Sequence, residues 1–225
     1  MSTLPILPDD DSELSASDRV TKTLRDAIAR GKFQAGERMY QDEVAESLGV
    51  SRQPVRQAFQ RLQAEGLLSQ PRPGRVVVTK MTPEDVIDNI SIRLILEPFA
   101  ARLAAEKIQP HQIEELRRCN RLIREDWQNK QNWNYEFHKV IAEASGSKVL
   151  AQFIDRLWFG MPVRPMSDAL RGDTAQVSAA AHDQMIACLE RGDADGVEAL
   201  MITHISNTMK FHIRRNSRQL EAEED

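Results

Sequence analysis

Apolar residues recur with a helical period along most of this chain of 225 residues. The first stripe, which predicts a helix at about 18–30, consists of Val20, Leu24, Ala27 and Ile28. From Pro83 onward the same period continues almost to the end of the chain. The only convincing strand signal is the run Arg75–Val78, directly after a Pro-Arg-Pro-Gly turn. The pattern therefore predicts a mainly α protein with one small β-element.

Two short helices, predicted at about 41–48 and 52–65, are separated by only Gly49, Val50 and Ser51. Glycine adopts the left-handed conformation that ends many helices, and serine is a frequent N-cap of the next helix. A short, glycine-containing break between two helices is typical of a helix-turn-helix. Residues 67–78 then predict a β-hairpin, so this part of the chain is expected to fold as a winged helix-turn-helix.

The polar face of the helix predicted at 52–65 is rich in arginine and glutamine. These side chains pair bidentately with guanine and adenine edges in the major groove of DNA. The turn of the hairpin adds further arginines, which suit contacts with phosphates or the minor groove. The candidate DNA-binding residues are Arg52, Gln53, Arg56, Gln57, Arg72, Gly74 and Arg75.

The net charge of −4 at pH 7 would argue against nucleic-acid binding if it were spread evenly. Residues 17–80, however, hold 12 Lys and Arg against 7 Asp and Glu. The acidic excess lies in residues 1–16 and 81–225. Phosphate binding needs a local positive potential, which a protein of acidic overall charge can provide. The sequence thus supports double-stranded DNA as a partner.

Composition divides the chain into four segments. Residues 1–16 are acidic and rich in proline and serine, and are expected to form a disordered tail. Residues 17–80 form the predicted winged helix-turn-helix, and residues 81–215 an all-α helical bundle. The helices of the bundle are predicted at about 83–106, 109–129, 133–144, 148–159, 174–190 and 194–214. Residues 216–225 are expected to be a frayed tail.

The chain is expected to lie in the cytoplasm and to have no membrane partner. No apolar run approaches the roughly 18 residues that a membrane span needs. The acidic N-terminus lacks the basic start and apolar block of a secretory signal. The two cysteines, Cys119 and Cys188, lie in helical patterns, and no disulfide is expected between them.

Four polar residues of the predicted bundle form a candidate metal site. His182 and His204 lie at about equal distances before and after the turn at 191–193. Two helices joined by a short turn fold back antiparallel, so the two imidazoles should lie at nearly the same height. Asn134 and His138 are four residues apart and share one helix face. Three imidazoles and one oxygen donor suit a divalent metal ion, with positions left open for water or an anion.

The segment ESLGVSRQPVRQAFQRLQAEGLL, followed by a wing with a glycine at its tip, resembles the GntR superfamily of bacterial regulators. The family pattern is roughly LGVSRxPVREALxxLxxEGL. The resemblance implies DNA contacts for Arg52 and Arg56 and a place in the wing for Gly74. Gln57 stands where glutamate is usual. Asp42 stands where some members carry a DNA-contacting arginine, so one contact is expected to be missing.

The helical part resembles the FadR-type branch of this superfamily, whose effector domain is called FCD. The segments NWNYEFHKV, AAHDQM and MITHI match the family's ligand positions at Asn134, His138, His182 and His204. The resemblance implies zinc, with nickel or manganese as alternatives, and often an organic acid that completes its shell. Many members have aspartate where this chain has Asn134, and a neutral amide is a weaker ligand.

Arg93 matches a family arginine that commonly meets a carboxylate effector. The resemblance therefore implies an effector contact for Arg93. The plainer interpretation is a helix ion pair with Glu97, four residues further on.

The sequence as a whole predicts a DNA-binding transcriptional regulator, expected to be a repressor. A homodimer would read a palindromic operator, because two-fold symmetry presents two recognition helices. A small carboxylate effector would control operator affinity. A regulator for which the metal itself is the signal is an alternative. A metalloenzyme is a more distant one, because the spacing places no carboxylate as a general base beside the histidines.

Overall fold

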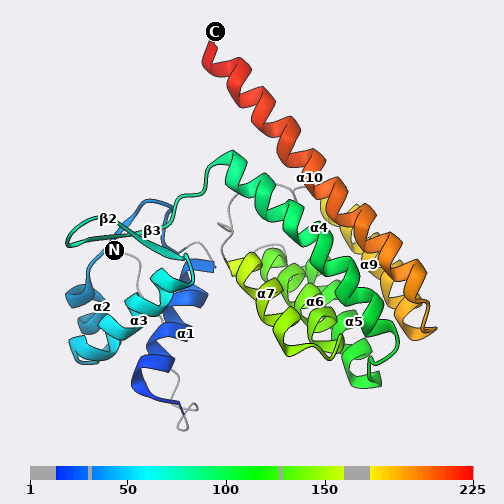
Figure 1. The fold of residues 1–225 in the computed structure, drawn as a ribbon, viewed down its shortest axis with the longest axis horizontal. Helices are drawn as coiled ribbons and strands as arrows, with labels where there is room; N and C mark the ends of the chain where they lie inside the picture. The colour runs from blue at the N-terminus through cyan, green and yellow to red at the C-terminus, as the bar shows by residue number, and fades with distance from the viewer. Residues whose placement is uncertain (1–13, 30–31, 127–128, 160–172, 225) are drawn as a thin grey trace. The chain divides into compact units, whose positions relative to one another are not determined.

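The computed structural model describes residues 14–29, 32–126, 129–159 and 173–224. The chain forms two compact units, which are divided between Met81 and Thr82. The first unit contains helices and a small sheet, and the described part of the second is helical (Figure 1). The predicted fold class, a winged helix-turn-helix followed by an all-α domain, is confirmed.

The N-terminal unit combines three helices with a three-stranded antiparallel sheet in the order β1-β3-β2. Its elements are α1 (Ala16–Ala29), β1 (Arg38–Met39), α2 (Gln41–Leu48), α3 (Arg52–Ala64), β2 (Leu68–Arg72) and β3 (Arg75–Val78). β2 and β3 are the predicted hairpin. The sequence pattern misses β1, because two residues are too few to show an alternation of apolar and polar positions.

The turn between α2 and α3 begins and ends at the residues that the sequence indicates. Gly49 has a φ of 65°, in the left-handed region that favours glycine. The N–H groups of Gly49 and Val50 donate to carbonyls of the last turn of α2, at 3.2 and 3.0 Å. Ser51 has the extended backbone of an N-cap, but its side chain makes no capping hydrogen bond.

The C-terminal unit contains α4 (Pro83–Ala105), α5 (Pro110–Glu125), α6 (Lys130–Ala144), α7 (Lys148–Phe159), α9 (Asp173–Glu190) and α10 (Ala194–Glu224). α4 starts with a capping box. The Thr82 hydroxyl accepts from the Asp85 N–H at 3.1 Å, and the Asp85 carboxylate accepts from the Thr82 N–H at 2.7 Å. None of the described helices combines the length and apolar character that crossing a bilayer requires.

The ends of some segments differ from the prediction. α10 continues to Glu224, so the segment 216–225, expected to be a frayed tail, is helical as far as it is described. Arginine, glutamine, leucine, alanine and glutamate fill this segment, and all are strong helix formers. At the other end, α1 begins at Ala16, the last residue of the predicted N-terminal tail, and residues 1–13 lie outside the described residues.

Ion pairs at one end of the bundle fix the relative direction of α4 and α10. Arg102, near the end of α4, bridges Asp195 at 2.5 Å and Glu198 at 2.8 Å, both in the first turns of α10. The two helices therefore run antiparallel, and Figure 1 shows them side by side.

The same end of the bundle also holds the ends of α6 and α9. Lys107, just after α4, donates to the carbonyl of Ser145, just after α6, at 2.9 Å. Gly192, in the turn after α9, lies close to the carbonyl oxygen of Ala105. α4, α6 and α9 thus run in one direction, and α10 runs in the opposite one.

Candidate functional site

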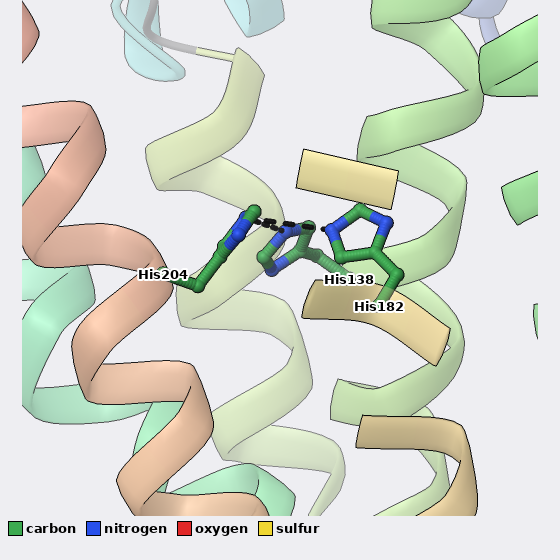
Figure 2. Close-up of side chains that lie close together, drawn as sticks. All are labelled: His138, His182 and His204. Carbon is green, nitrogen blue, oxygen red and sulfur yellow. Dashed lines mark hydrogen bonds between the residues drawn. The ribbon is translucent and has the colours of Figure 1, made fainter. Parts of the chain in front are cut away.

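Three histidine rings meet inside the helical unit (Figure 2). His138 comes from α6, His182 from α9 and His204 from α10. Nε2 of His204 lies 3.3 Å from Nε2 of His138 and 3.4 Å from Nε2 of His182. The candidate ligand nitrogens of the three residues all lie within 4.8 Å of one another. The structure thus brings together the three histidines that the sequence analysis selects.

The distances between these nitrogens fit the ligands of a single metal ion. A zinc ion held tetrahedrally at about 2.0–2.1 Å from each nitrogen separates its ligand nitrogens by about 3.3–3.4 Å. Two of the separations in the cluster have this value. Imidazole nitrogen is also a donor that zinc, copper, iron and nickel accept. The residues present therefore fit a divalent transition metal.

Glu97 on α4 orients His138. One carboxylate oxygen lies 2.5 Å from Nδ1 of His138, while the other accepts from Arg93 Nε at 2.5 Å and from Trp158 Nε1 at 3.0 Å. A carboxylate beside Nδ1 holds the proton on that nitrogen and leaves the lone pair of Nε2 for a metal. Burial raises the pKa of Glu97, but Arg93 and then His138 outweigh burial and lower the pKa to about 2. Glu97 is therefore a carboxylate at neutral pH.

Asn120 on α5 holds His182 in a similar way. Its Oδ1 lies 3.2 Å from Nδ1 of His182. Its amide nitrogen donates to the carbonyl of Ala179 at 3.0 Å and to the carboxylate of Asp183 at 2.6 Å. With both amide hydrogens used, Oδ1 is the acceptor that faces the ring. The His182 ring also stacks on Phe137, with 3.9 Å between the centroids, so its orientation is fixed.

Burial keeps the cluster unprotonated. Burial first, and then the neighbouring His204 and His138, lower the pKa of His182 well below its usual range. Burial and His138 lower the pKa of His204 to about 3. Both rings are therefore neutral at pH 7, which is the form in which imidazole binds metal ions.

Asn134 lies one turn before His138 and is 4% exposed. Its Oδ1 is buried and has no hydrogen-bond partner. Buried side-chain oxygens almost always have a partner, so an unpartnered one needs an explanation. An amide oxygen is a neutral donor of a kind that binds divalent cations. With three neutral rings and a neutral amide, a bound divalent cation would keep its full charge, which favours an anionic ligand.

Arg93 is 2% exposed and pairs with Glu97. Its guanidinium also lies over the ring of Trp158, 3.7 Å from the centroid. The plainer interpretation of Arg93, a helix ion pair, is therefore present in the structure. A direct contact between Arg93 and a carboxylate effector stays a prediction.

The DNA-binding residues predicted on α3 and the wing are all exposed, and they are Arg52, Gln53, Arg56, Gln57, Arg72, Gly74 and Arg75. The opposite face of α3 is buried in the N-terminal unit through Val55, Ala58, Phe59 and Leu62. Helix α3 thus presents arginine and glutamine to solvent. Gly74 has a φ of 74° in the turn of the wing, where a side chain would be strained.

Ion pairs hold α3 in place. Arg25 of α1 pairs with Glu65 at 2.6 Å, and Arg61 pairs with Asp18. Arg52 pairs with Asp42 of α2 at 2.7 Å, although both side chains are largely exposed. Asp42 therefore lies beside one of the two arginines that the family resemblance selects for DNA contact.

The fold and the histidine cluster define a class of protein, in which a winged helix-turn-helix precedes a helical domain with a candidate ligand site. Two family models match the chain: "Bacterial regulatory proteins, gntR family" over residues 16–78, and "FCD domain" over residues 88–207. The chain belongs to the GntR family of bacterial regulatory proteins, in the group that carries an FCD domain. It is a transcriptional regulator of this type and not an enzyme.

Several curated regulators are similar to this chain. The probable D-xylose utilization operon transcriptional repressor of Paenarthrobacter nicotinovorans is 28% identical, over 80% of each chain. The putative L-lactate dehydrogenase operon regulatory protein of Escherichia coli is also 28% identical, over 86% of each chain. The uncharacterized regulator YdhC of Bacillus subtilis is 26% identical, over 60% of this chain and 62% of that protein. Among solved structures, E. coli McbR/YncC superposes with a TM-score of 0.80 at 21% identity, over 90% of this chain and 99% of that one, and supports the fold.

Proposed function

We propose that this protein is a repressor whose affinity for its operator is controlled by a small carboxylate bound at a metal site. The ligands are Nε2 of His138, His182 and His204 together with Oδ1 of Asn134. Zinc is the expected metal, with nickel or manganese as alternatives. The observation that carries this proposal is the convergence of three oriented imidazole nitrogens one helical turn from a buried amide oxygen that has no partner. The name of the Paenarthrobacter relative supports repression.

The metal, when bound, supplies a positive charge to which a carboxylate can bind. The chain contributes the orientation of the ligands, since Glu97 and Asn120 hold two of the rings by their Nδ1 atoms. The ligands lie on α6, α9 and α10. A ligand that binds more tightly to one arrangement of these helices shifts the population toward that arrangement.

In the N-terminal unit, we propose that the exposed residues of α3, Arg52, Gln53, Arg56 and Gln57, read bases in the major groove. Arg72, Gly74 and Arg75 of the wing contact phosphates or the minor groove. A homodimer presents two copies of α3 to a palindromic operator. Analytical ultracentrifugation tests this, because a monomer at micromolar concentration would contradict it.

A zinc titration tests the site directly. Protein freed of metal by chelator is titrated with zinc against a chromophoric competitor, and we expect one zinc ion per chain. His182→Ala should abolish this binding, and Asn134→Ala should weaken it. His111→Ala is the matched control, because His111 is exposed on α5. Binding by His182→Ala that equals that of the wild type would refute the site.

Operator binding tests the response. A duplex selected by the protein from a random library is labelled, and fluorescence anisotropy is recorded with zinc, with chelator and with a panel of carboxylates. We expect one class of acid to change operator affinity, and chelator to remove the effect. Affinity that follows free zinc without any acid would instead make the metal the signal. Affinity that responds to neither would refute the proposed control.

A further inference from the structure

Two more buried oxygens without partners lie in the helical unit. Ser178 on α9 is 8% exposed, and its Oγ has no hydrogen-bond partner. Asn89 on α4 is partly exposed as a residue, but its Oδ1 is buried and also has no partner. Each such group represents an unmet hydrogen bond in the interior. Their positions relative to the histidine cluster suggest what meets it.

Ser178 lies on the same side of the cluster as Asn134. Ser178 comes four residues before His182, and Asn134 comes four residues before His138. Residues four apart share a helix face. Because α6 and α9 run parallel, both side chains lie about one turn, or about 5.4 Å, from the histidines in the same direction.

Asn89 lies on the face of α4 that is turned toward the cluster. Asn89, Arg93 and Glu97 follow one another at intervals of four residues, so they share this face. Glu97 contacts His138, which shows where the face points.

The register of the helices places Asn89 and Ser178 at about the same height. The hairpin of α9 and α10 brings Ser178 level with Thr208 of α10. The bridges from Arg102 to the first turns of α10 bring Thr208 level with about Ile90 of α4. Asn89 and Ser178 therefore lie in one layer, beside the histidine layer.

The chemistry of Asn89 restricts what can bind there. Its amide nitrogen donates to the carbonyl of Leu157 at 3.0 Å, so the remaining atom is the acceptor oxygen. A ligand must therefore offer an O–H or N–H group. The nearby Arg93 is positive, and the one buried carboxylate, Glu97, is already paired with it. A neutral hydroxyl suits this surrounding better than an ammonium group.

From these positions we infer that the effector is a hydroxycarboxylate, whose hydroxyl groups bind Ser178 and Asn89 while its carboxylate binds at the histidine cluster. The inference rests on the proposed function. A separation of about one helical turn between the two layers fits a hydroxyl on the third or fourth carbon of the acid.

Calorimetric titration of the zinc-loaded full chain tests this inference with butanoate, 3-hydroxybutanoate, 4-hydroxybutanoate and 4-aminobutanoate. We expect a hydroxylated acid to bind about 5- to 150-fold more tightly than butanoate, because it meets buried groups that butanoate leaves unpaired. Ser178→Ala should remove most of this advantage and leave the affinities for butanoate and zinc unchanged. Ser178→Thr keeps the hydroxyl and should keep the advantage. Gln184→Ala, exposed on α9, is the control.

The outcomes separate this inference from the proposed function. Failure of the wild type to bind zinc or any of these acids would overturn both. Zinc and butanoate binding without a preference for a hydroxyl would overturn this inference alone. A preference for 4-aminobutanoate, or an advantage that Ser178→Ala leaves intact, would also overturn it.

Discussion

Replacing Glu97 by glutamine tests how the histidine cluster is held. Glutamine keeps the shape of the side chain but removes the charge that Arg93 needs in the interior. The pKa of Glu97 is about 2 against an ordinary 4.5, so its surroundings strongly favour the carboxylate. At 1.36 kcal/mol per unit, this difference corresponds to about 3 kcal/mol. Breaking a buried ion pair costs about 3–5 kcal/mol in other proteins, which is the same order.

We therefore expect Glu97→Gln to lower the free energy of unfolding by about 3 kcal/mol and the Tm by about 6–12 °C. Urea unfolding followed by circular dichroism, with chelator present, measures the effect. Adding Arg93→Met to Glu97→Gln should recover part of the loss, because no unpaired charge is then left. The stabilisation by the carboxylate should be present above about pH 4.5 and be lost as the pH falls toward 2.

Zinc affinity gives the second readout for Glu97. A group that orients a metal ligand typically changes metal affinity by about 10- to 100-fold when it is replaced. We expect a loss of this size in Glu97→Gln at a temperature where the variant is folded. Unchanged stability would refute the reasoning about the ion pair. Lost stability with unchanged zinc affinity would show that Glu97 does not position His138.

Three further changes test other parts of the molecule. Arg52→Ala should weaken operator binding by about 1–3 kcal/mol and relax the preference at one base pair, as measured by anisotropy on operator variants. Thr82→Ala breaks the capping box of α4 and should lower the free energy of unfolding by about 0.5–2 kcal/mol in urea. Below about pH 6.5, His182 and His204 take up protons in the unfolded chain but not in the fold. The metal-free protein should therefore lose up to about 1.4 kcal/mol of stability per pH unit for each ring, as measured by urea unfolding from pH 8 to 5.

Each of these changes has its own control. Lys80→Ala removes an exposed positive charge outside α3, and a loss of operator affinity equal to that of Arg52→Ala would argue against base reading. Thr82→Ser keeps a hydroxyl at the cap and should retain most of the stability. A stability that stays constant between pH 7 and pH 5 would contradict the buried, neutral state of His182 and His204.

Local geometry explains why the sequence predicted the histidine cluster. The fourfold spacing of Asn134 and His138, and the symmetric placement of His182 and His204 about one turn, need only the dimensions of an α-helix. The groups that orient the rings were missed. Glu97 and His138 are 41 residues apart, so their contact depends on how two helices pack.

Asn120 left a weaker signal in the sequence. It lies in a stripe with Ile113, Leu116 and Ile123, and all four are buried. A polar residue in such a stripe indicates a buried hydrogen bond, but it does not name the partner. The partner, His182, lies 62 residues further along the chain. Sequence spacing therefore identified the candidate ligands, and tertiary packing decided what supports them.

The spacing of the cluster along the chain has a consequence for folding. His138 and His204 are 66 residues apart, and His182 and His204 are 22 apart. Contacts between distant segments carry an entropic cost of loop closure, so they are expected to form late. The cluster and its orienting groups require α4, α5, α6, α9 and α10 together. The unfolded chain therefore offers no comparable site, and the regulator gains the capacity to respond to a ligand only when its helical unit is complete.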